Sequence, residues 1–408
     1  MGYMNIFRRL FCRVFQGGMR ILLPLFPYRE PRLLADEAEA AQVLCDGGVR
    51  RVMLVAGKTV RSHGLTASLE AALASAGVAV TVYDGTQPNP TSDNVEEAIG
   101  LYLREGCEGL IALGGGSAMD CAKAVGAGIV RPKKSLKSMA GLIKIRRRLP
   151  PFIAIPTTAG SGSETTVASV IVDSATHHKY VINDFCLIPH YALMLPELTV
   201  GLPRGLTATT GMDALTHAVE AYIGRSRTRG TSRAAKEAVR LIFENLERAY
   251  LDGTDLEARR NMLYASYLAG TAFTKSYVGY VHAVAHTLGG KYGIAHGLAN
   301  AVLLPKVLRA YGSHAVRPLA ELARASGLAT SDVSDTEACR MFISRIEEMN
   351  AGMNIPEGLD CILEEDIASM ARLADKEANP LYPVPVLWNA SELEALYRTA
   401  AKENAAGV

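Results

Sequence analysis

The stretch GLIALGGGSAMDCAKAVGAGIV, residues 109–130, changes character near its middle. Its first part is apolar and rich in Leu and Ile, which predicts a buried strand. Three glycines from Gly114 to Gly116 follow, and small residues suited to a helix continue from Ala118. A strand that passes through a tight glycine turn into a helix is the repeating unit of α/β folds.

Similar units flank this stretch on both sides. Residues 49–57, 78–85 and 151–160 are apolar runs that predict three further strands, and residues 66–77 and 94–106 have the pattern of the helices between them. Strands that alternate with helices pair in parallel through right-handed crossovers. We therefore expect a doubly wound parallel sheet in the amino-terminal part of the chain.

The pattern changes after about residue 200. From there to the end the apolar residues follow helical periodicity, and runs of β-branched residues are few. The chain has 408 residues, whereas a single core seldom grows past about 250–300 residues. The sequence therefore predicts a second, all-helical domain that begins near residues 196–205.

Composition limits the classes of partner. The net charge is +2 and 21% of the residues are charged, which excludes a general attraction to nucleic acid. Residues 131–151 carry eight basic side chains and no acidic one, but they lack interleaved aromatic residues and favour a solvated loop. Seven dispersed cysteines without a C-x-x-C pair indicate free thiols in a reducing compartment, so a cytoplasmic location is expected.

The first 27 residues are apolar but repeatedly interrupted. Arg8, Arg9, Arg13 and Arg20 break the apolar run, which is therefore too short for the roughly 20 residues that cross a bilayer. No other segment has that length of apolar sequence either. An extension that packs on the body of the protein or on a partner subunit is favoured, and an amphipathic helix lying on a surface is the alternative.

Two loops are suited to a nucleotide. The sequence GGGSAMDCAK (114–123) lets the backbone approach a ligand where a helix begins, and helix starts favour phosphate groups. The sequence PTTAGSGSE (156–164) repeats the arrangement and adds hydroxyl groups. A tight turn without a ligand would explain either loop alone. Two such loops at the carboxyl ends of parallel strands mark the usual nucleotide crevice.

Histidines and one aspartate recur at helical spacing in the second half. Asp213 and His217 are four residues apart, His282 and His286 repeat that spacing, and His296 follows a bend that contains glycine. Residues four apart share one helix face. A lone pair of this kind is more often structural, but two sets in apolar surroundings predict a divalent cation site. Spacing alone leaves open which three histidines bind, and whether the cation is iron, zinc, manganese or nickel.

A cation held by three imidazoles and one carboxylate would act as a Lewis acid toward an alcohol or carbonyl oxygen. A nicotinamide held by the two glycine-rich loops would exchange hydride with the substrate carbon. A further histidine that titrates near neutrality would carry the proton to solvent.

Taken together and in order, these motifs resemble one family. The motifs PNPT (88–91), GGGSAMDCAK, PTTAGSGSE, GMDALTHAVEAY (211–222) and HAVAHTLGGKYGIAHG (282–297) make the chain from about residue 28 onward similar to the iron-containing (group III) alcohol dehydrogenases. The resemblance implies an extension at 1–27, a dinucleotide-binding α/β domain at 28–200 and an all-helical metal-binding domain at 201–408, with the active site in the cleft between the two domains. It also implies an enzyme that moves hydride between a small alcohol, aldehyde or ketone and NAD or NADP, and that forms a homo-oligomer such as a dimer.

Matched motif by motif, the resemblance also assigns roles to single residues. The implied metal ligands are Asp213, His217, His282 and His296, which leaves His286 as the proton-handling group beside the nicotinamide. The implied cofactor contacts are Asn89, Gly115, Gly116, Ser117, Asp120, Thr157, Thr158, Ser161 and Lys179.

One departure bears on the choice of cofactor. Many members of the family have an Asp after the first strand of this domain, and that acid bonds the adenosine ribose and repels a 2′-phosphate. This chain has Gly57 there, with Lys58 and Arg61 nearby, so NADP becomes as suitable as NAD. A second departure, Leu195 before Pro196 where the family often has Asp, is expected to change packing only.

Other functions of the same superfamily remain alternatives. A polyol dehydrogenase of the glycerol type, with zinc in place of iron, fits the same motifs, and a maleylacetate reductase fits less well because the Asp/His set is intact. A lyase similar to dehydroquinate synthase would need a basic pocket for a phosphorylated acid. A nucleotide or metal binder without activity would be expected to lack part of the metal set, and none is missing here.

Overall fold

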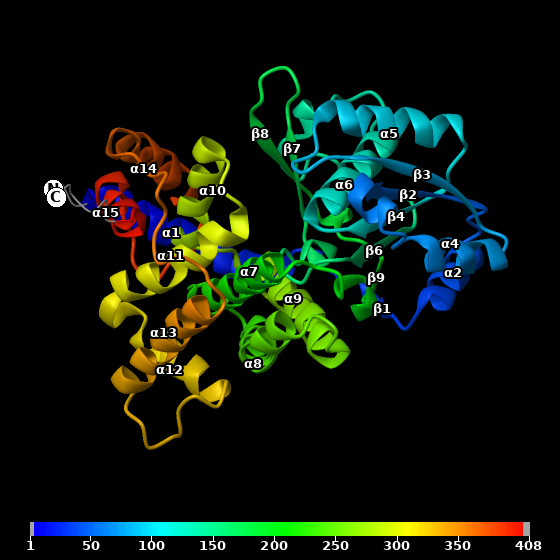
Figure 1. The fold of residues 1–408 in the computed structure, drawn as a ribbon. Helices are drawn as coiled ribbons and strands as arrows, with labels where there is room; N and C mark the ends of the chain where they lie inside the picture. Colours follow the sequence, from blue (N-terminus) through cyan, green and yellow to red (C-terminus); the bar gives the residue numbers. More distant parts are fainter. Residues whose placement is uncertain (1–3, 403–408) are drawn as a thin grey trace. The chain divides into compact units, whose positions relative to one another are not determined.

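The computed structural model describes residues 4–402, and these form two compact units. One unit runs from Pro27 to Gly201, and the other combines residues 4–26 with residues 202–402. Figure 1 shows strands and helices in the first unit and helices alone in the main body of the second. The expected fold class, a parallel α/β domain with an all-helical domain, is confirmed.

The sheet of the α/β unit is parallel throughout. Its strand order is β1-β9-β6-β4-β2-β3, and each neighbouring pair runs in the same direction. The strands are β1 (Arg32–Leu34), β2 (Arg51–Gly57), β3 (Ala79–Thr86), β4 (Gly109–Gly114), β6 (Phe152–Pro156) and β9 (Tyr191–Leu193). The four strands expected from sequence are present, although the fourth ends at Pro156, before the glycine-rich loop. The three-residue strands β1 and β9 were not expected, because three residues show no periodicity.

Helices cover both faces of this sheet. They are α2 (Glu37–Asp46), α3 (Lys58–Ser62), α4 (Ala67–Ser75), α5 (Ser92–Arg104) and α6 (Gly116–Val130). Alternate residues of β2 face opposite cores: Met53 and Val55 pack with residues of α5 and α6, whereas Val52 and Leu54 pack with residues of α2 and α4. This two-sided burial explains why the strands are apolar without alternation.

A second, three-stranded sheet with the order β5-β8-β7 was not expected from sequence. It consists of β5 (Gly141–Leu142), β7 (Ala168–Val172) and β8 (Lys179–Asn183). Within residues 131–151, the basic side chains are mostly exposed, as expected for a solvated loop.

The helical unit is built around α7 (Arg204–Ile223), which is buried along most of its length. The remaining helices are α8 (Arg229–Leu251), α9 (Leu256–Ser276), α10 (Tyr280–Tyr292), α11 (His296–Ala310), α12 (Val316–Ala325), α13 (Asp335–Gly352), α14 (Glu364–Ala378) and α15 (Ala390–Ala400). None of the helices among residues 4–402 is both long and apolar enough to cross a membrane. All seven cysteines are free thiols.

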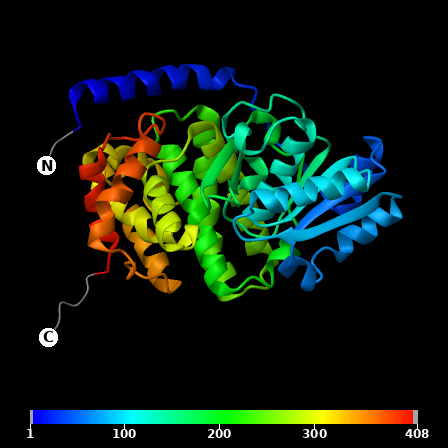
Figure 2. The same cartoon turned by 90° about the horizontal axis from the view of Figure 1, so that it is seen from above.

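The amino-terminal helix α1 (Ile6–Leu22) belongs to the helical unit, and Figure 2 shows it along the outside of the other helices of that unit. The Arg8 guanidinium donates to both carboxylate oxygens of Asp375 on α14, at 2.8 and 2.6 Å. The side chain of Gln16 donates to the carbonyl oxygen of Tyr382 at 2.7 Å. Polar contacts therefore fix the helix on the unit.

Candidate metal and nucleotide sites

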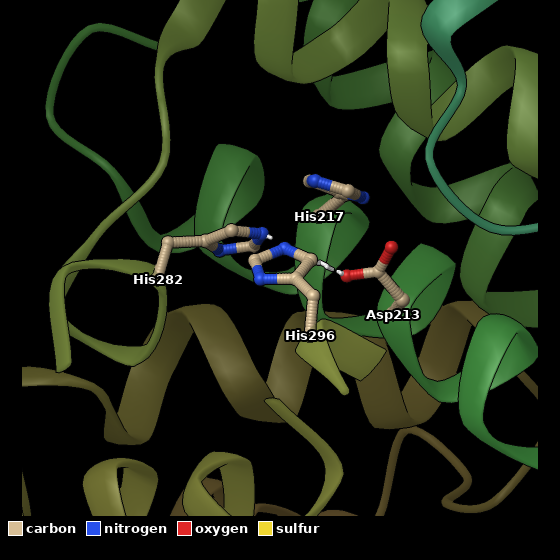
Figure 3. Close-up of side chains that lie close together, drawn as sticks. All are labelled: Asp213, His217, His282 and His296. Carbon is tan, nitrogen blue, oxygen red and sulfur yellow. Dashed lines mark ion pairs between the residues drawn. The ribbon is translucent and has the colours of Figure 1, made fainter. Parts of the chain in front are cut away.

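Four side chains from three helices meet in the helical unit. Asp213 and His217 lie on α7, His282 lies on α10, and His296 is the first residue of α11. One potential ligand atom from each lies within 4.8 Å of the others. Figure 3 shows the carboxylate and the three imidazoles turned toward one another. The Nε2 atoms of His296 and His282 lie 3.4 and 3.9 Å from Asp213 Oδ1.

Missing side chains allow the helices to come this close. A Cβ atom on Gly211 would lie 2.3 Å from Leu246 of α8, and one on Gly297 would lie 2.3 Å from the carbonyl oxygen of Thr209 on α7. Gly297 directly follows His296, so its contact with α7 brings the start of α11 against the helix that carries Asp213. A side chain at Gly297 would force the backbone of α7 and α11 apart, and one at Gly211 would force Leu246 to move.

A buried carboxylate fixes the orientation of His282. Glu220 lies on α7, accepts backbone hydrogen bonds from Gly279 and Val281 at 2.8 Å each, and lies 2.6 Å from His282 Nδ1. With the Nδ1 proton held by Glu220, the Nε2 lone pair faces the cluster. Burial raises the pKa of Glu220 to about 7, against the hydrogen bonds that favour its charged form. Burial, with the neighbouring imidazoles, lowers the pKa of His282 well below its usual value, so this ring is neutral as a metal ligand requires.

Asn300 completes the inner surroundings of the four side chains. It lies one turn after His296 on α11, is fully buried, and donates to Asp213 Oδ1 at 2.7 Å. The same nitrogen lies 3.3 Å from His282 Nε2 and 3.1 Å from His296 Nε2. An amide nitrogen has two hydrogens for these three acceptors. The Asn300 side chain therefore cannot donate a hydrogen bond to all three acceptor atoms at once.

His286 occupies a different position. Its ring stacks on that of His296 at a centroid distance of 5.2 Å, and its Nδ1 lies 2.7 Å from Glu377 Oε1. Its side chain is 43% exposed, in contrast to the buried His282. Burial opposes its protonation, but Glu377, with Asp213 and Glu220, outweighs this and raises the pKa of His286. The Tyr382 hydroxyl donates to the same carboxylate oxygen at 2.8 Å and fixes it.

The donor set suits a divalent transition metal. Three imidazoles and one carboxylate bind iron(II) and zinc, and several acceptor atoms that share one amide donor are favourably placed for a cation. Glu220 supplies the outer carboxylate that such histidine ligands usually have. The residues present therefore fit a resident metal ion.

The two glycine-rich loops of the α/β unit lie side by side, because β4 and β6 are neighbours in the sheet. A Cβ atom on Gly115 would lie 3.3 Å from the Thr158 hydroxyl, and one on Gly116 would lie 3.3 Å from the Ser161 hydroxyl. Thr157 is buried and donates its backbone N–H to the carbonyl oxygen of Gly114 at 3.0 Å. The amino terminus of α6 and the hydroxyls of the second loop thus form one polar surface that suits phosphate groups.

Three more of the expected cofactor residues connect to this surface. The Ser117 hydroxyl accepts from the Asn89 backbone N–H at 3.4 Å, and Lys179 on β8 donates to the Asn89 side chain at 2.7 Å. Asp120 is placed differently, next to the fully buried Lys123. Burial raises the pKa of Asp120 to about 7, against the attraction of Lys123.

Lys123 is a residue that sequence reasoning missed. Its ammonium group donates to the carbonyl oxygens of Ser163, Thr166 and Ala168 at 2.6, 2.9 and 3.0 Å. It thereby ties the chain after the second loop to helix α6. A lysine within a run of small apolar residues was the signal that could have found it.

With this geometry established, comparison with known proteins identifies the family. Residues 35–196 match the model for iron-containing alcohol dehydrogenases, and residues 207–401 match the model for the carboxyl-terminal part of the same family. The chain is 38% identical to a 1,3-propanediol dehydrogenase of Klebsiella pneumoniae over 93% of its own length and 98% of the relative's. The chain belongs to the iron-containing alcohol dehydrogenase family.

Solved structures agree with this assignment. Superposition on the crystal structure of a 1,3-propanediol oxidoreductase gives a TM-score of 0.87 at 36% sequence identity. The superposed region covers 91% of this chain and 98% of the oxidoreductase chain. A sulfoacetaldehyde reductase from Bifidobacterium kashiwanohense, solved in complex with NAD⁺, has a TM-score of 0.82 and 28% identity, and covers 93% and 99%. The chain is accordingly an oxidoreductase that exchanges hydride between an alcohol, or its carbonyl counterpart, and a nicotinamide cofactor.

Proposed function

We propose that the enzyme depends on iron(II), held by Asp213, His217, His282 and His296. The observation that carries this proposal is the convergence of one ligand atom from each residue within 4.8 Å. Family membership supports iron, whereas the donor set alone fits zinc equally well. When bound, the ion would act as a Lewis acid toward the substrate oxygen.

His286 and Glu377 are proposed to handle the proton of the reaction. His286 is exposed on one side and paired with a carboxylate on the other, so it can accept a proton at the site and release it to water. Glu377 stabilises the charged imidazole, and Tyr382 holds Glu377 in place. Glu220 has another role, because it orients His282 through Nδ1, whereas burial and the neighbouring imidazoles disfavour protonation of that ring.

Gly115, Gly116, Ser117, Thr157, Thr158 and Ser161 are proposed to bind the pyrophosphate and nicotinamide of the cofactor, with Asn89, Lys179 and Asp120 next to them. The end of β2 is the proposed place of the adenosine ribose. Gly57 caps α3 there without a carboxylate, and the exposed Lys58 follows it. Gly57 itself brings no carboxylate that would repel a 2′-phosphate, so we propose that the enzyme accepts NADP as well as NAD.

The proposed substrates are small primary alcohols and diols and their aldehydes, since the similar proteins are named for 1,3-propanediol and sulfoacetaldehyde. A homodimer is proposed from the exposed edge strand β3, and a cytoplasmic location from the free thiols.

The decisive experiment is metal reconstitution of the purified chain. Metal-depleted protein is loaded without oxygen with Fe(II), Zn(II), Ni(II) or Mn(II), and bound metal and reduction of NAD⁺ and NADP⁺ are measured with C1–C4 alcohols and diols. We expect one equivalent of metal and the highest activity with iron. His296→Gln should lose the metal, whereas His286→Gln should retain it and lose turnover. Full activity after exhaustive chelation would exclude the metal-dependent mechanism.

A further inference from the structure

The amino-terminal helix α1 presents its polar side to the protein and its apolar side to solvent. Ile6 and Phe7 are 75% and 78% exposed, values unusual for large apolar side chains in a packed helix. We call the exposed apolar side chains of α1 and of Leu25, which follows it, the outer face of α1: Ile6, Phe7, Leu10, Phe11, Val14, Ile21, Leu22 and Leu25.

Helical geometry places most of these residues on one side. Positions 7, 10, 11, 14 and 21 follow the three- and four-residue spacing of one helix face. Gly17 and Gly18 fall on the same side, and a Cβ atom on either would have no neighbour within 4 Å. The outer face is therefore a continuous apolar strip, which a soluble surface rarely exposes without a binding role.

The contacts of the opposite side prevent the helix from turning over. Arg8 forms its two hydrogen bonds with Asp375, and Gln16, only 4% exposed, donates to Tyr382. The Arg13 guanidinium donates to the carbonyl oxygens of Val384 and Pro385 at 2.8 and 2.9 Å. Rotation of α1 that buried the outer face would break these hydrogen bonds and leave Gln16 or Asp375 without these partners. The outward orientation is thus a property of the fold.

The charged residues of α1 itself have one sign. Arg9 and Arg20 are exposed, and on the helical wheel both lie to the same side of the apolar strip, beyond Arg13. The first acidic residue of the chain is Glu30, beyond the end of this segment. A helix with an apolar face, cations to one side of it and no acids has the composition of helices that lie in the plane of an anionic membrane surface.

We propose that α1 binds the surface of a bilayer that contains anionic phospholipids. The outer face would enter the boundary between headgroups and acyl chains, and Arg9 and Arg20 would contact the phosphates. The polar contacts to Asp375 and Tyr382 would keep the helical unit attached. A second copy of the chain is the less favoured occupant, because two such faces in contact would bring arginines together without any acid in α1 to neutralise them.

Vesicle binding by the full-length, metal-loaded protein tests this proposal. We expect cosedimentation with vesicles of equal parts phosphatidylcholine and phosphatidylglycerol, weaker binding at high salt, and little binding to phosphatidylcholine alone. Arg9→Gln/Arg20→Gln should weaken binding roughly thirtyfold, since each cation near an anionic surface contributes about fivefold. Phe7→Asp/Phe11→Asp should abolish binding, because it places charge in the apolar layer.

Matched controls show that the effect belongs to α1. Leu103→Asp changes an apolar side chain on α5 that is 61% exposed, and Arg372→Gln removes an exposed cation from α14; both should bind as the unaltered protein does. Thermal unfolding and alcohol oxidation without vesicles should be the same in all variants. In a Phe11→Trp variant, brominated lipid should quench the fluorescence of the new tryptophan. The fluorescence of Trp388, the only native tryptophan, should not be quenched.

Three results would overturn the proposal. They are no binding of the unaltered chain to anionic vesicles, equal binding of the Phe7→Asp/Phe11→Asp variant, and dissociation of a dimer by that variant in light scattering without any lipid effect. The last result would assign the outer face to a second copy of the chain.

Discussion

Replacement of Glu220 by Gln should weaken metal binding without removing a ligand. The carboxylate accepts three N–H groups, from Gly279, Val281 and His282. A glutamine side chain keeps one acceptor oxygen and turns the other position into a donor. In the best orientation, its oxygen accepts from Gly279 and His282, and its NH₂ group faces the Val281 N–H.

The cost has two parts. A buried donor that faces another donor costs about 1–3 kcal/mol of folding free energy, and this part is present with or without metal. The bond to His282 also loses its charge, which makes Nε2 a weaker ligand and frees the ring to rotate. Loss of such an outer partner typically reduces metal affinity by about 10–100-fold.

The two parts can be measured separately. Chemical unfolding of the metal-free protein gives the first, and competition with a chromogenic chelator gives the metal dissociation constant. Glu164→Gln is the control, because Glu164 is an equally buried carboxylate in the α/β unit, remote in sequence from every proposed ligand. We expect both variants to lose stability and only Glu220→Gln to lose metal affinity. A change in the dissociation constant below about threefold would refute the orienting role of Glu220.

Three further perturbations test other parts of the structure. Gly57→Asp should lower kcat/KM for NADP⁺, because its carboxylate would repel the 2′-phosphate, and should leave kcat/KM for NAD⁺ nearly unchanged. The new side chain is tolerated, since its Cβ would lie 3.4 Å from the Thr86 carbonyl oxygen. Equal losses for both cofactors would contradict the placement of the ribose. Glu377→Gln should lower the pKa of His286, since the carboxylate raises it, and so move the acidic limb of the kcat/KM profile to lower pH under the same metal loading; an unmoved limb would remove His286 from proton transfer. His190 is partly buried, and burial, with Arg29 and Arg148, lowers its pKa from 6.5 to about 4. The folded state therefore disfavours the charged ring. The contribution of neutral His190 to the free energy of unfolding is complete above pH 6.5 and declines as the pH falls toward 4, by at most about 2 kcal/mol after screening. The free energy of urea unfolding should fall more steeply with decreasing pH for the unaltered chain than for His190→Asn. Parallel pH dependences would be inconsistent with a neutral buried His190.

Local sequence patterns predicted the strands and helices that are long enough to show a periodicity of apolar residues. The strand, glycine turn and helix at residues 109–130 form β4 and α6, because apolar periodicity and the turn both act within a few residues. The strands β1 and β9 could not be predicted in this way. They are three residues long and become strands only because β6 offers a free edge to β9, and β9 in turn to β1. Such pairing depends on partners distant in sequence.

The same distinction holds for the metal cluster. The i, i+4 spacing indicated that Asp213 and His217 share a face, but the approach of α10 and α11 depends on contacts such as Gly297 against Thr209. Glu220 was missed although it lies within the same motif, one turn after His217. A buried glutamate needs donors to be stable, and those donors come from Gly279 and Val281, some 60 residues later.

Two histidine–glutamate pairs in one site illustrate how surroundings assign roles. Both pairs have a carboxylate near Nδ1, at 2.6 Å in His282 and 2.7 Å in His286. His282 is buried among other imidazoles, so protonation is disfavoured and Nε2 stays available to a cation. The side chain of His286 is partly exposed, and the attraction of Glu377, with that of Asp213 and Glu220, outweighs desolvation, so the ring holds a proton more readily. The fold thus places the same two residue types in surroundings suited to the two proposed roles, metal ligand and proton carrier, and burial together with the neighbouring charged and titratable groups separates them.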